Sequence, residues 1–501
     1  MTTIDPPGAS RVEDWGRVHL IGVGGAGMSA IAALLAARGL TVSGSDARDS
    51  ATLAAVRASG VRTWVGHEAA HVDDADVVVV STAVRSSNPE LVRARELGRR
   101  VLHRSEALAA LMAGRTAVAV AGAHGKTTTS AMTAVILSDV GLDPSYAIGG
   151  TVLGVGDAAV SLPVRGARNG SGRVFIAEAD ESDGSFLAYS PTIAVVTNVE
   201  ADHLDHYGSL DAFEAVFVEF TERIVDGGWL VACADDAGAR RLVGTVHAAL
   251  AARGVQVVTY GTADAPAGSD AHVTIADYVA DGDGSRAVVR ATSGRGPLPT
   301  TGPVLLELAV PGAHNVANAT AAWIVAALLG VDPVRAAAGA AAFRGTGRRF
   351  EDRGTVAGVR VVDDYAHHPT EVAALLRAAR TVAGAGRVLV LFQPHLYSRT
   401  RVFAREFAEA LALADVVVVT GIYGAREDPE PGVTGALIVD AMTRPGTYVA
   451  DRGEAASRLA AESRSGDLVL TVGAGDVTDL GPVVLDELAR RHGGRPGGGP
   501  A

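Results

Sequence analysis

The chain has 501 residues, of which 48% are hydrophobic and 20% are charged, so a mainly disordered protein is excluded. At about 100–200 residues per domain, this length predicts three domains, each able to bury its own core. The 44 basic and 56 acidic residues give a net charge of −12, which argues against a general nucleic-acid binder. The single cysteine, Cys233, excludes an internal disulfide, and no signal peptide or apolar run of about 20 residues is visible. We therefore expect a cytoplasmic protein without membrane insertion.

Three times the chain restarts with a short apolar run, a glycine-rich turn and a helical pattern, which predicts α/β units with parallel strands. The predicted domain limits are 1–113, 114–344 and 345–501, with a disordered tail over 491–501. Residues 156–173 are predicted to be a surface insertion that ends in a flexible loop. The unusual polar clusters follow the strands, at the sheet edge where ligands bind in such folds.

The first glycine-rich turn, residues 22–27 (G-V-G-G-A-G), follows a predicted strand and opens a helix from Met28. This G-x-G-x-x-G pattern lets the backbone turn tightly, so that a diphosphate can bind at the helix N-terminus. Asp46 ends the next predicted strand, where an acid can bind a ribose hydroxyl. The motif predicts a nucleotide site without distinguishing NAD from another nucleotide diphosphate, and a turn without a ligand is the alternative.

A second loop, residues 122–129 (G-A-H-G-K-T-T-T), follows the apolar strand 117–121 and precedes a helix. Backbone N–H groups of such a loop bind phosphates, while Lys126 would neutralise them and the Thr127 hydroxyl would reach Mg²⁺. The spacing is not that of the usual P-loop, because Gly122 lies three residues before Gly125 where the common motif has five. The flanking elements nevertheless favour an ATP site over a chance match.

Two acidic clusters end the next predicted strands, at residues 178–183 (E-A-D-E-S-D) and 198–206 (N-V-E-A-D-H-L-D-H). Either cluster alone would be typical of a solvated loop. Two of them at adjacent strand ends, downstream of a phosphate loop, predict a metal–phosphate site, since Mg²⁺ takes oxygen ligands. Further polar segments follow at 311–319, 347–350, 363–369 and 393–401.

With these motifs in order, the chain resembles the Mur ligases from about Gly22 to Asp476. The resemblance implies a Rossmann-like N-terminal domain, a central P-loop-type ATPase domain and a Rossmann-like C-terminal domain. It also implies ATP-dependent amide formation in peptidoglycan precursor synthesis, with Mg²⁺, by a monomer or homodimer. The motifs are most similar to those of the members that join L-alanine to UDP-N-acetylmuramate.

The resemblance carries residue roles onto matching positions of this sequence. The implied UDP-sugar site comprises Gly22, Gly24, Gly25, Ala26, Gly27, Met28 and Asp46. The implied ATP site comprises Gly122, Ala123, His124, Gly125, Lys126, Thr127, Thr128, Asn315, Asn318 and Arg349. The implied magnesium-linked positions are Thr127, Glu178 and His203, and the implied catalytic set is Lys126, Glu178, His203, Arg349 and Asp364. The implied amino-acid site comprises Tyr365, His367 and Arg399.

The sequence departs from the family pattern at three positions. Ala123 replaces the usual Thr, Ala366 replaces a usual Gly, and Leu396 stands where many relatives carry Arg. With Leu396 at that position, Arg399 is the expected anchor of the amino-acid carboxylate, and the alternative is that Arg399 is a surface residue and Arg401 or another cation binds it. The general base stays open between His203 and Asp364.

Three other interpretations compete. The nearest is another ligase of this superfamily, of the muropeptide-recycling or folylpolyglutamate type. An NAD-dependent oxidoreductase would leave the phosphate loop and the acidic clusters unexplained. A regulatory nucleotide-binding module would not need the complete catalytic set.

Overall fold

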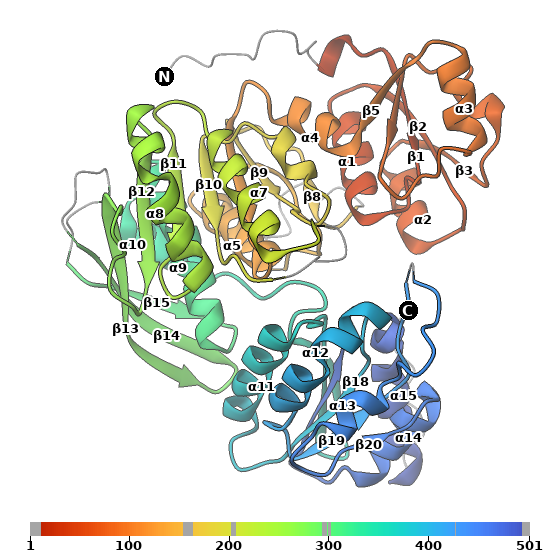
Figure 1. The fold of residues 1–501 in the computed structure, drawn as a ribbon, viewed down its shortest axis with the longest axis vertical. Coiled ribbons are helices and arrows are strands. Elements are labelled where there is room, and N and C mark those ends of the chain that lie inside the picture. The colour runs from red at the N-terminus through yellow and green to blue at the C-terminus, as the bar shows by residue number, and fades with distance from the viewer. Residues whose placement is uncertain are drawn as a thin grey trace. The chain divides into compact units, whose positions relative to one another are not determined.

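The structure is a computed structural model, and it describes residues 12–153, 164–201, 207–292, 298, 302–425 and 427–492. Among these residues the strands form three sheets of five, ten and six strands. Most neighbouring strands are parallel, and helices alternate with strands along the chain (Figure 1). The chain divides into two compact units, one of residues 1–277, 287–307 and 316–343, and one of residues 278–286, 308–315 and 344–501. Both units have the α/β character that the sequence predicts.

The N-terminal sheet has the order β3-β2-β1-β4-β5, all parallel, as in Rossmann-type domains. Its elements are β1 (Arg17–Ile21), α1 (Ala26–Ala37), β2 (Thr41–Asp46), α2 (Ala51–Ala58), β3 (Arg62–Val65), β4 (Val77–Val80), α3 (Pro89–Glu96), β5 (Arg100–His103) and α4 (Arg104–Met112). Successive side chains of a strand point to opposite faces, so Leu20 packs with α1 and α4, whereas Ile21 packs with α3.

A buried carboxylate lies on the α3 face of this sheet. Glu90 is fully buried and accepts a hydrogen bond from Ser45 Oγ at 2.5 Å. Its oxygens also lie 2.6 Å from His71 Nδ1 and 3.1 Å from His67 Nδ1. Burial would raise the pKa of Glu90, but hydrogen bonds from His19, Ser45 and His71 outweigh it and lower the pKa to about 2. The carboxylate is therefore charged and satisfied inside the domain.

The central sheet has the order β15-β14-β13-β12-β11-β10-β6-β9-β7-β8. Its strands are β6 (Thr116–Ala121), β7 (Ser145–Ala147), β8 (Ala167–Arg168), β9 (Val174–Glu178), β10 (Ile193–Val196), β11 (Trp229–Cys233), β12 (Gln256–Gly261), β13 (Ala271–Asp281), β14 (Gly284–Thr292) and β15 (Val304–Leu308). Its helices are α5 (Lys126–Asp139), α7 (Leu210–Glu222), α8 (Ala237–Ala252), α9 (Ala313–Leu328) and α10 (Pro333–Ala340). Three fully buried aromatic side chains, Phe213, Phe217 and Phe220, repeat at helical spacing and bind α7 to the core.

The predicted surface loop over 156–173 is wrong for its described part, residues 164–173. Val164 and Ala167 are each 3% exposed, and β8 pairs with β7. A Cβ on Gly170 or Gly172 would lie about 2 Å from backbone carbonyls of residues 142–143, at 2.1 and 1.9 Å. The glycines therefore serve close packing instead of flexibility.

The C-terminal sheet has the order β16-β17-β21-β18-β19-β20, in which only β16 pairs antiparallel among the described strands. Its elements are β16 (Glu351–Val356), β17 (Val359–Asp364), α11 (Pro369–Ala383), β18 (Val388–Phe392), α12 (Tyr397–Leu411), β19 (Val416–Val419), α13 (Ala436–Asp440), β20 (Thr447–Tyr448), α14 (Arg452–Glu462), β21 (Leu468–Val472) and α15 (Leu480–Arg491). Val388, Val390 and Phe392 pack with α11 and α12. Leu389 and Leu391 face α14 and α15, so helices cover both faces (Figure 1).

Two further features bear on function. No helix within the described residues has the length and apolar character to span a bilayer.

Cys233, at the end of β11, is a free thiol and 8% exposed. Burial raises the pKa of this thiol to about 11, so it is protonated at neutral pH.

Candidate active site

The first glycine-rich turn joins β1 to α1 and is held by the end of β2. The N–H groups of Gly22 and Val23 donate to the Ser45 carbonyl at 2.8 and 2.9 Å. The Gly24 N–H donates to Asp46 Oδ2 at 2.9 Å. A Cβ on Gly24 would lie only 2.8 Å from that oxygen, so glycine is needed for the close approach. Asp46, the predicted ribose-binding acid, thus also positions the loop backbone.

The first turn of α1 leaves its N–H groups open to a ligand. This turn, described in full, has no acidic residue and no side-chain cap. Gly25 and Ala26 are exposed and Gly27 is half-buried, whereas the Met28 side chain is buried in the core. Open N–H groups at a helix N-terminus attract anions. The turn therefore fits a diphosphate bound by backbone, with no part for the Met28 side chain.

The second loop joins β6 to α5 through two glycines with positive φ. The φ angle is +129° at Gly122 and +82° at Gly125. A Cβ on Gly122 would lie 2.2 Å from Thr197 Oγ1, and one on Gly125 would lie 2.8 Å from Asn318 Oδ1. Both the backbone conformation and the neighbouring side chains therefore require glycine.

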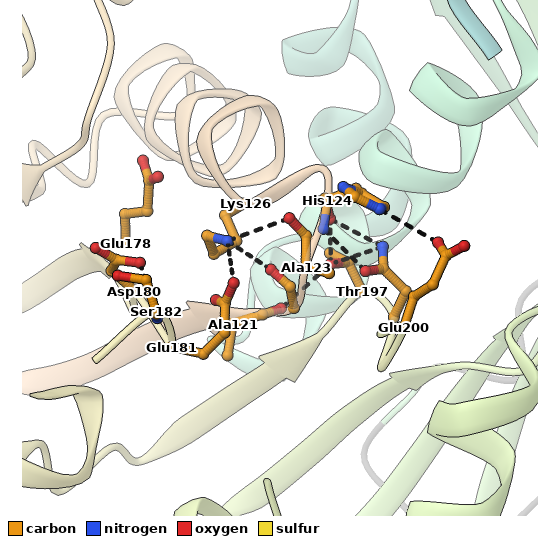
Figure 2. Close-up of polar contacts among 12 residues, drawn as sticks. Ala121, Ala123, His124, Lys126, Glu178, Asp180, Glu181, Ser182, Thr197 and Glu200 are labelled. Atoms are coloured by element: carbon orange, nitrogen blue, oxygen red, sulfur yellow. Dashed lines mark hydrogen bonds and ion pairs between the residues drawn. The ribbon is translucent and has the colours of Figure 1, made fainter. Parts of the chain in front are cut away.

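The middle of this loop is fastened to the segment after β10. The His124 N–H donates to Asn198 Oδ1 at 2.8 Å, and Thr197 Oγ1 donates to the His124 carbonyl at 2.5 Å (Figure 2). Glu200 Oε2 lies 3.2 Å from His124 Nε2. The His124 backbone is thus held at both its N–H and its carbonyl, which fixes the conformation of the loop. Thr128, one turn on, is only 9% exposed.

Lys126 begins α5 with its ammonium group surrounded by oxygens. Its Nζ donates to the carbonyls of Gly122 and Ala123 at 2.7 and 3.3 Å, and to Glu181 Oε1 at 2.9 Å (Figure 2). Burial would lower the pKa of Lys126, but the carboxylates of Glu181 and Asp180 outweigh it and raise the pKa. Lys126 is therefore a permanent cation at the helix N-terminus.

Glu178 and Thr127 supply neighbouring oxygens beside this lysine. Both Glu178 carboxylate oxygens lie 3.0 Å from Thr127 Oγ1, and the Gly149 N–H donates to Oε2 at 2.8 Å. A hydroxyl and a carboxylate are hard donors of the kind that Mg²⁺ prefers. Two of the three predicted magnesium-linked residues thus lie together, while His203 falls outside the described residues.

Sequence reasoning assigned no role to Glu181, the buried partner of Lys126. Glu181 is fully buried. Burial raises its pKa to about 7, although Lys126 lowers it. The only signal in the sequence is the density of acids over 178–183, which does not reveal which carboxylate is buried.

The two asparagines of the implied ATP site, Asn315 and Asn318, have different partners. Asn318 Oδ1 accepts from Thr129 Oγ1 at 3.1 Å, next to the phosphate loop. Asn315 Nδ2 donates to the carbonyl of Pro311, which lies just before α9, at 2.7 Å. Asn318 is therefore close to the loop of Lys126, and Asn315 helps to shape the beginning of α9.

In the C-terminal unit, Asp364 ends β17 in a buried position. Its oxygens accept from the Phe350 and Ala366 N–H groups, both at 2.8 Å. Burial raises the pKa of Asp364 to about 6, and Arg349 acts in the opposite direction. Arg349 Nη1 lies 3.3 Å from Glu371 Oε1, and its guanidinium lies 5.2 Å from the Tyr365 ring centre. The structure thus brings Arg349, Asp364 and Tyr365 together.

The predicted amino-acid residues occupy the loop after β17 and the start of α12. The Tyr365 and His367 rings are 5.2 Å apart, and the His367 N–H donates to Glu371 Oε2 at 2.9 Å. Arg399, in the first turn of α12, is 7% exposed. Leu396 precedes that helix with φ +69° and is 5% exposed, so this position holds a buried apolar side chain.

Comparisons with known proteins give one family over most of the chain. Three family models match in order: the Mur ligase family catalytic domain over 17–116, the Mur ligase middle domain over 120–326, and the Mur ligase glutamate ligase domain over 348–475. A UDP-N-acetylmuramate–L-alanine ligase of Kineococcus radiotolerans is 58% identical over 95% of this chain and 97% of its own. One of Renibacterium salmoninarum is 54% identical over the same shares. The crystal structure of UDP-N-acetylmuramate-alanine ligase from Thermotoga maritima is similar with a TM-score of 0.74 and 29% identity, covering 95% of this chain and 99% of that one.

Proposed function

Because the chain belongs to the Mur ligase family, we propose that it joins L-alanine to UDP-N-acetylmuramate with ATP, giving ADP and phosphate, in peptidoglycan precursor synthesis. The relatives named UDP-N-acetylmuramate–L-alanine ligase match the chain over nearly its whole length. The observation that carries the proposal is that Lys126 and Thr127 begin α5 and that Thr127 contacts Glu178 at the end of β9. These residues offer a fixed cation and hard oxygen donors at one phosphate loop.

The reaction we propose begins with attack of the lactyl carboxylate on the γ-phosphate of ATP. It forms an acyl phosphate and releases ADP, and this step supplies the leaving group that a carboxylate lacks. Two anions must approach each other, so the ammonium of Lys126 stabilises the charge on the transferring group. Bound Mg²⁺, held by Glu178, Thr127 and His203, would neutralise further phosphate charge. We also assign Asn315, Asn318 and Arg349 to ATP.

The second step is attack of the neutral amine of L-alanine on the acyl phosphate, through a tetrahedral intermediate that expels phosphate. We assign Arg399 to the α-carboxylate of alanine, with His367 and Tyr365 beside it. A guanidinium suits this task because its planar fork takes both carboxylate oxygens. Asp364 and His203 are the two candidates for the base that accepts the amine proton.

We assign the UDP-sugar to residues 1–113, ATP to residues 114–344 and the amino acid to residues 345–501. The diphosphate of the UDP-sugar would bind at the first turn of α1, whose N–H groups have no side-chain cap in this fully described turn. We also propose that the protein is cytoplasmic and acts as a monomer or homodimer.

The deciding experiment is phosphate release measured with ATP, Mg²⁺, UDP-N-acetylmuramate and L-alanine, and with each omitted in turn. We expect turnover only in the complete mixture. Equal turnover without UDP-N-acetylmuramate would refute the proposal. Replacing L-alanine by an L-alanyl peptide, or the UDP-sugar by a folate, tests the other amide ligases of the superfamily.

A further inference from the structure

One arginine connects the glycine-rich turn of the N-terminal sheet with the acidic segment after β9. Arg104 is the first residue of α4, and its side chain is 25% exposed. Its Nη2 lies 3.1 Å from Asp180 Oδ2 and 3.7 Å from Asp183 Oδ2. Its other terminal nitrogen, Nη1, lies 3.1 Å from the point where a Cβ on Gly27 would stand. The guanidinium therefore reaches both the acidic segment and the first turn of α1.

The charges around Arg104 and the first turn of α1 favour the binding of an anion. A helix N-terminus carries partial positive charge, so a cation packed against it is unfavourable unless negative charge lies nearby. Asp180 and Asp183 provide that charge on the Nη2 side only. On the Nη1 side, the described first turn of α1 offers N–H groups without a capping side chain or an acid.

We propose that Arg104 binds the diphosphate of the UDP-sugar through Nη1 while Nη2 remains on Asp180. The guanidinium and the α1 N–H groups would then hold the same phosphates, and Arg groups bind phosphate with a fork of two donors. Asp180 precedes Glu181, the partner of Lys126, so Arg104 also fixes the distance from the UDP-sugar to the phosphate loop. This inference rests on the proposed function and adds to it a residue that no sequence motif marks.

The test is calorimetric binding of UDP, uridine and ADP to the full chain. The variants are Arg104→Met, Arg104→Lys and the control Arg93→Met. Arg93 lies in the same domain and is also paired with an aspartate, Asp73, at 2.8 Å, but it belongs to α3, which packs on the opposite face of the sheet from α1. We expect Arg104→Met to weaken UDP binding about 10- to 150-fold, the loss typical of one charge-assisted hydrogen bond.

Other ligands distinguish this contact from a structural role. ADP binding should stay within about threefold of wild type, as for sites without a shared ligand. Uridine binding should be the same in wild type and Arg104→Met, because uridine has no phosphate. Arg104→Lys keeps the charge without the fork, so an intermediate loss is expected. It also serves as the test if Arg104→Met does not fold.

Several results would overturn the inference. Normal UDP binding by both Arg104 variants would remove Arg104 from the site and leave the proposed function standing. An equal loss of ADP and UDP binding would show that Arg104 only holds Asp180 in place. A wild-type chain that binds ADP but not UDP would overturn the proposed function together with this inference.

Discussion

Replacing Lys126 by methionine should separate the catalytic part of this lysine from its part in stability. Methionine keeps the aliphatic stem but removes the ammonium group that donates to Gly122, Ala123 and Glu181. If that group stabilises the transferring phosphoryl group, kcat for phosphate release should fall about 10²- to 10³-fold. The fold should persist, because Glu181 can accept a proton in place of its lost partner.

The stability cost follows from the state of Glu181. Removing one member of a buried ion pair typically costs about 3–5 kcal/mol. Burial raises the pKa of Glu181 to about 7, so at pH 6 the carboxyl is mostly neutral and we expect a loss of about 1–2 kcal/mol from hydrogen bonds alone. Without Lys126 the pKa of Glu181 rises further. The unfolding free energy of the variant, compared with wild type, should then decrease by up to about 1.4 kcal/mol for each pH unit above 7.

Urea unfolding between pH 6 and pH 9 measures this decrease, and phosphate release measures turnover. The double variant Lys126→Met/Glu181→Gln has no ionisable group at position 181, so its stability loss relative to wild type should be independent of pH above about pH 7, while its turnover stays low. Near-normal turnover of the single variant would refute the assignment of the loop to ATP phosphates. Restored turnover in the double variant would show that Lys126 serves only to neutralise Glu181.

Three further outcomes follow from the same geometry. Glu178→Gln should raise the Mg²⁺ concentration needed for half-maximal phosphate release, as should His203→Ala, and magnesium titrations that overlay the wild type would contradict the metal assignment. Arg399→Leu should raise the KM for L-alanine about 10- to 150-fold with little change for ATP, because one charge-assisted hydrogen bond is lost; the control Arg401→Leu, an exposed arginine paired with Glu430, should leave the KM for L-alanine unchanged. Burial raises the pKa of Asp364 to about 6 from an ordinary 3.8, so the folded state favours its protonated form and wild-type stability should fall between about pH 4 and pH 6, by up to about 3 kcal/mol. Asp364→Asn should lack this decline in urea unfolding, whereas parallel curves for the two proteins would speak against the raised pKa.

The elements that the sequence predicts well are those whose cause is local. Gly22, Gly122 and Gly125 have a positive φ, which glycine adopts readily, and each of the two loops stands where a strand meets a helix. The three α/β sheets and the family were predicted for the same reason and are confirmed. The roles of the individual site residues remain predictions.

The features that the sequence did not reveal depend on tertiary contacts. Arg104 is an ordinary first residue of a helix until the fold brings Asp180 to it. Glu90 resembles any acid near a helix N-terminus, and its burial among histidines becomes visible only in the folded sheet. Leu396 has a positive φ that no sequence rule for leucine predicts, and its N–H donates to the Tyr423 carbonyl at 3.0 Å, which holds that backbone in place.

The rate at which the protonated thiol of Cys233, at the end of β11, is modified should report local opening of the central sheet. Thiol reagents react with the thiolate, and Cys233 is buried with a pKa of about 11, so at neutral pH reagent should reach it only when the sheet opens around β11. Because it is the single cysteine, every modified molecule records the same event. The neighbouring strand β10 leads into Thr197, which anchors the phosphate loop. A nucleotide bound at that loop should therefore slow modification of Cys233, which links occupancy of the site to the rate at which the central sheet opens.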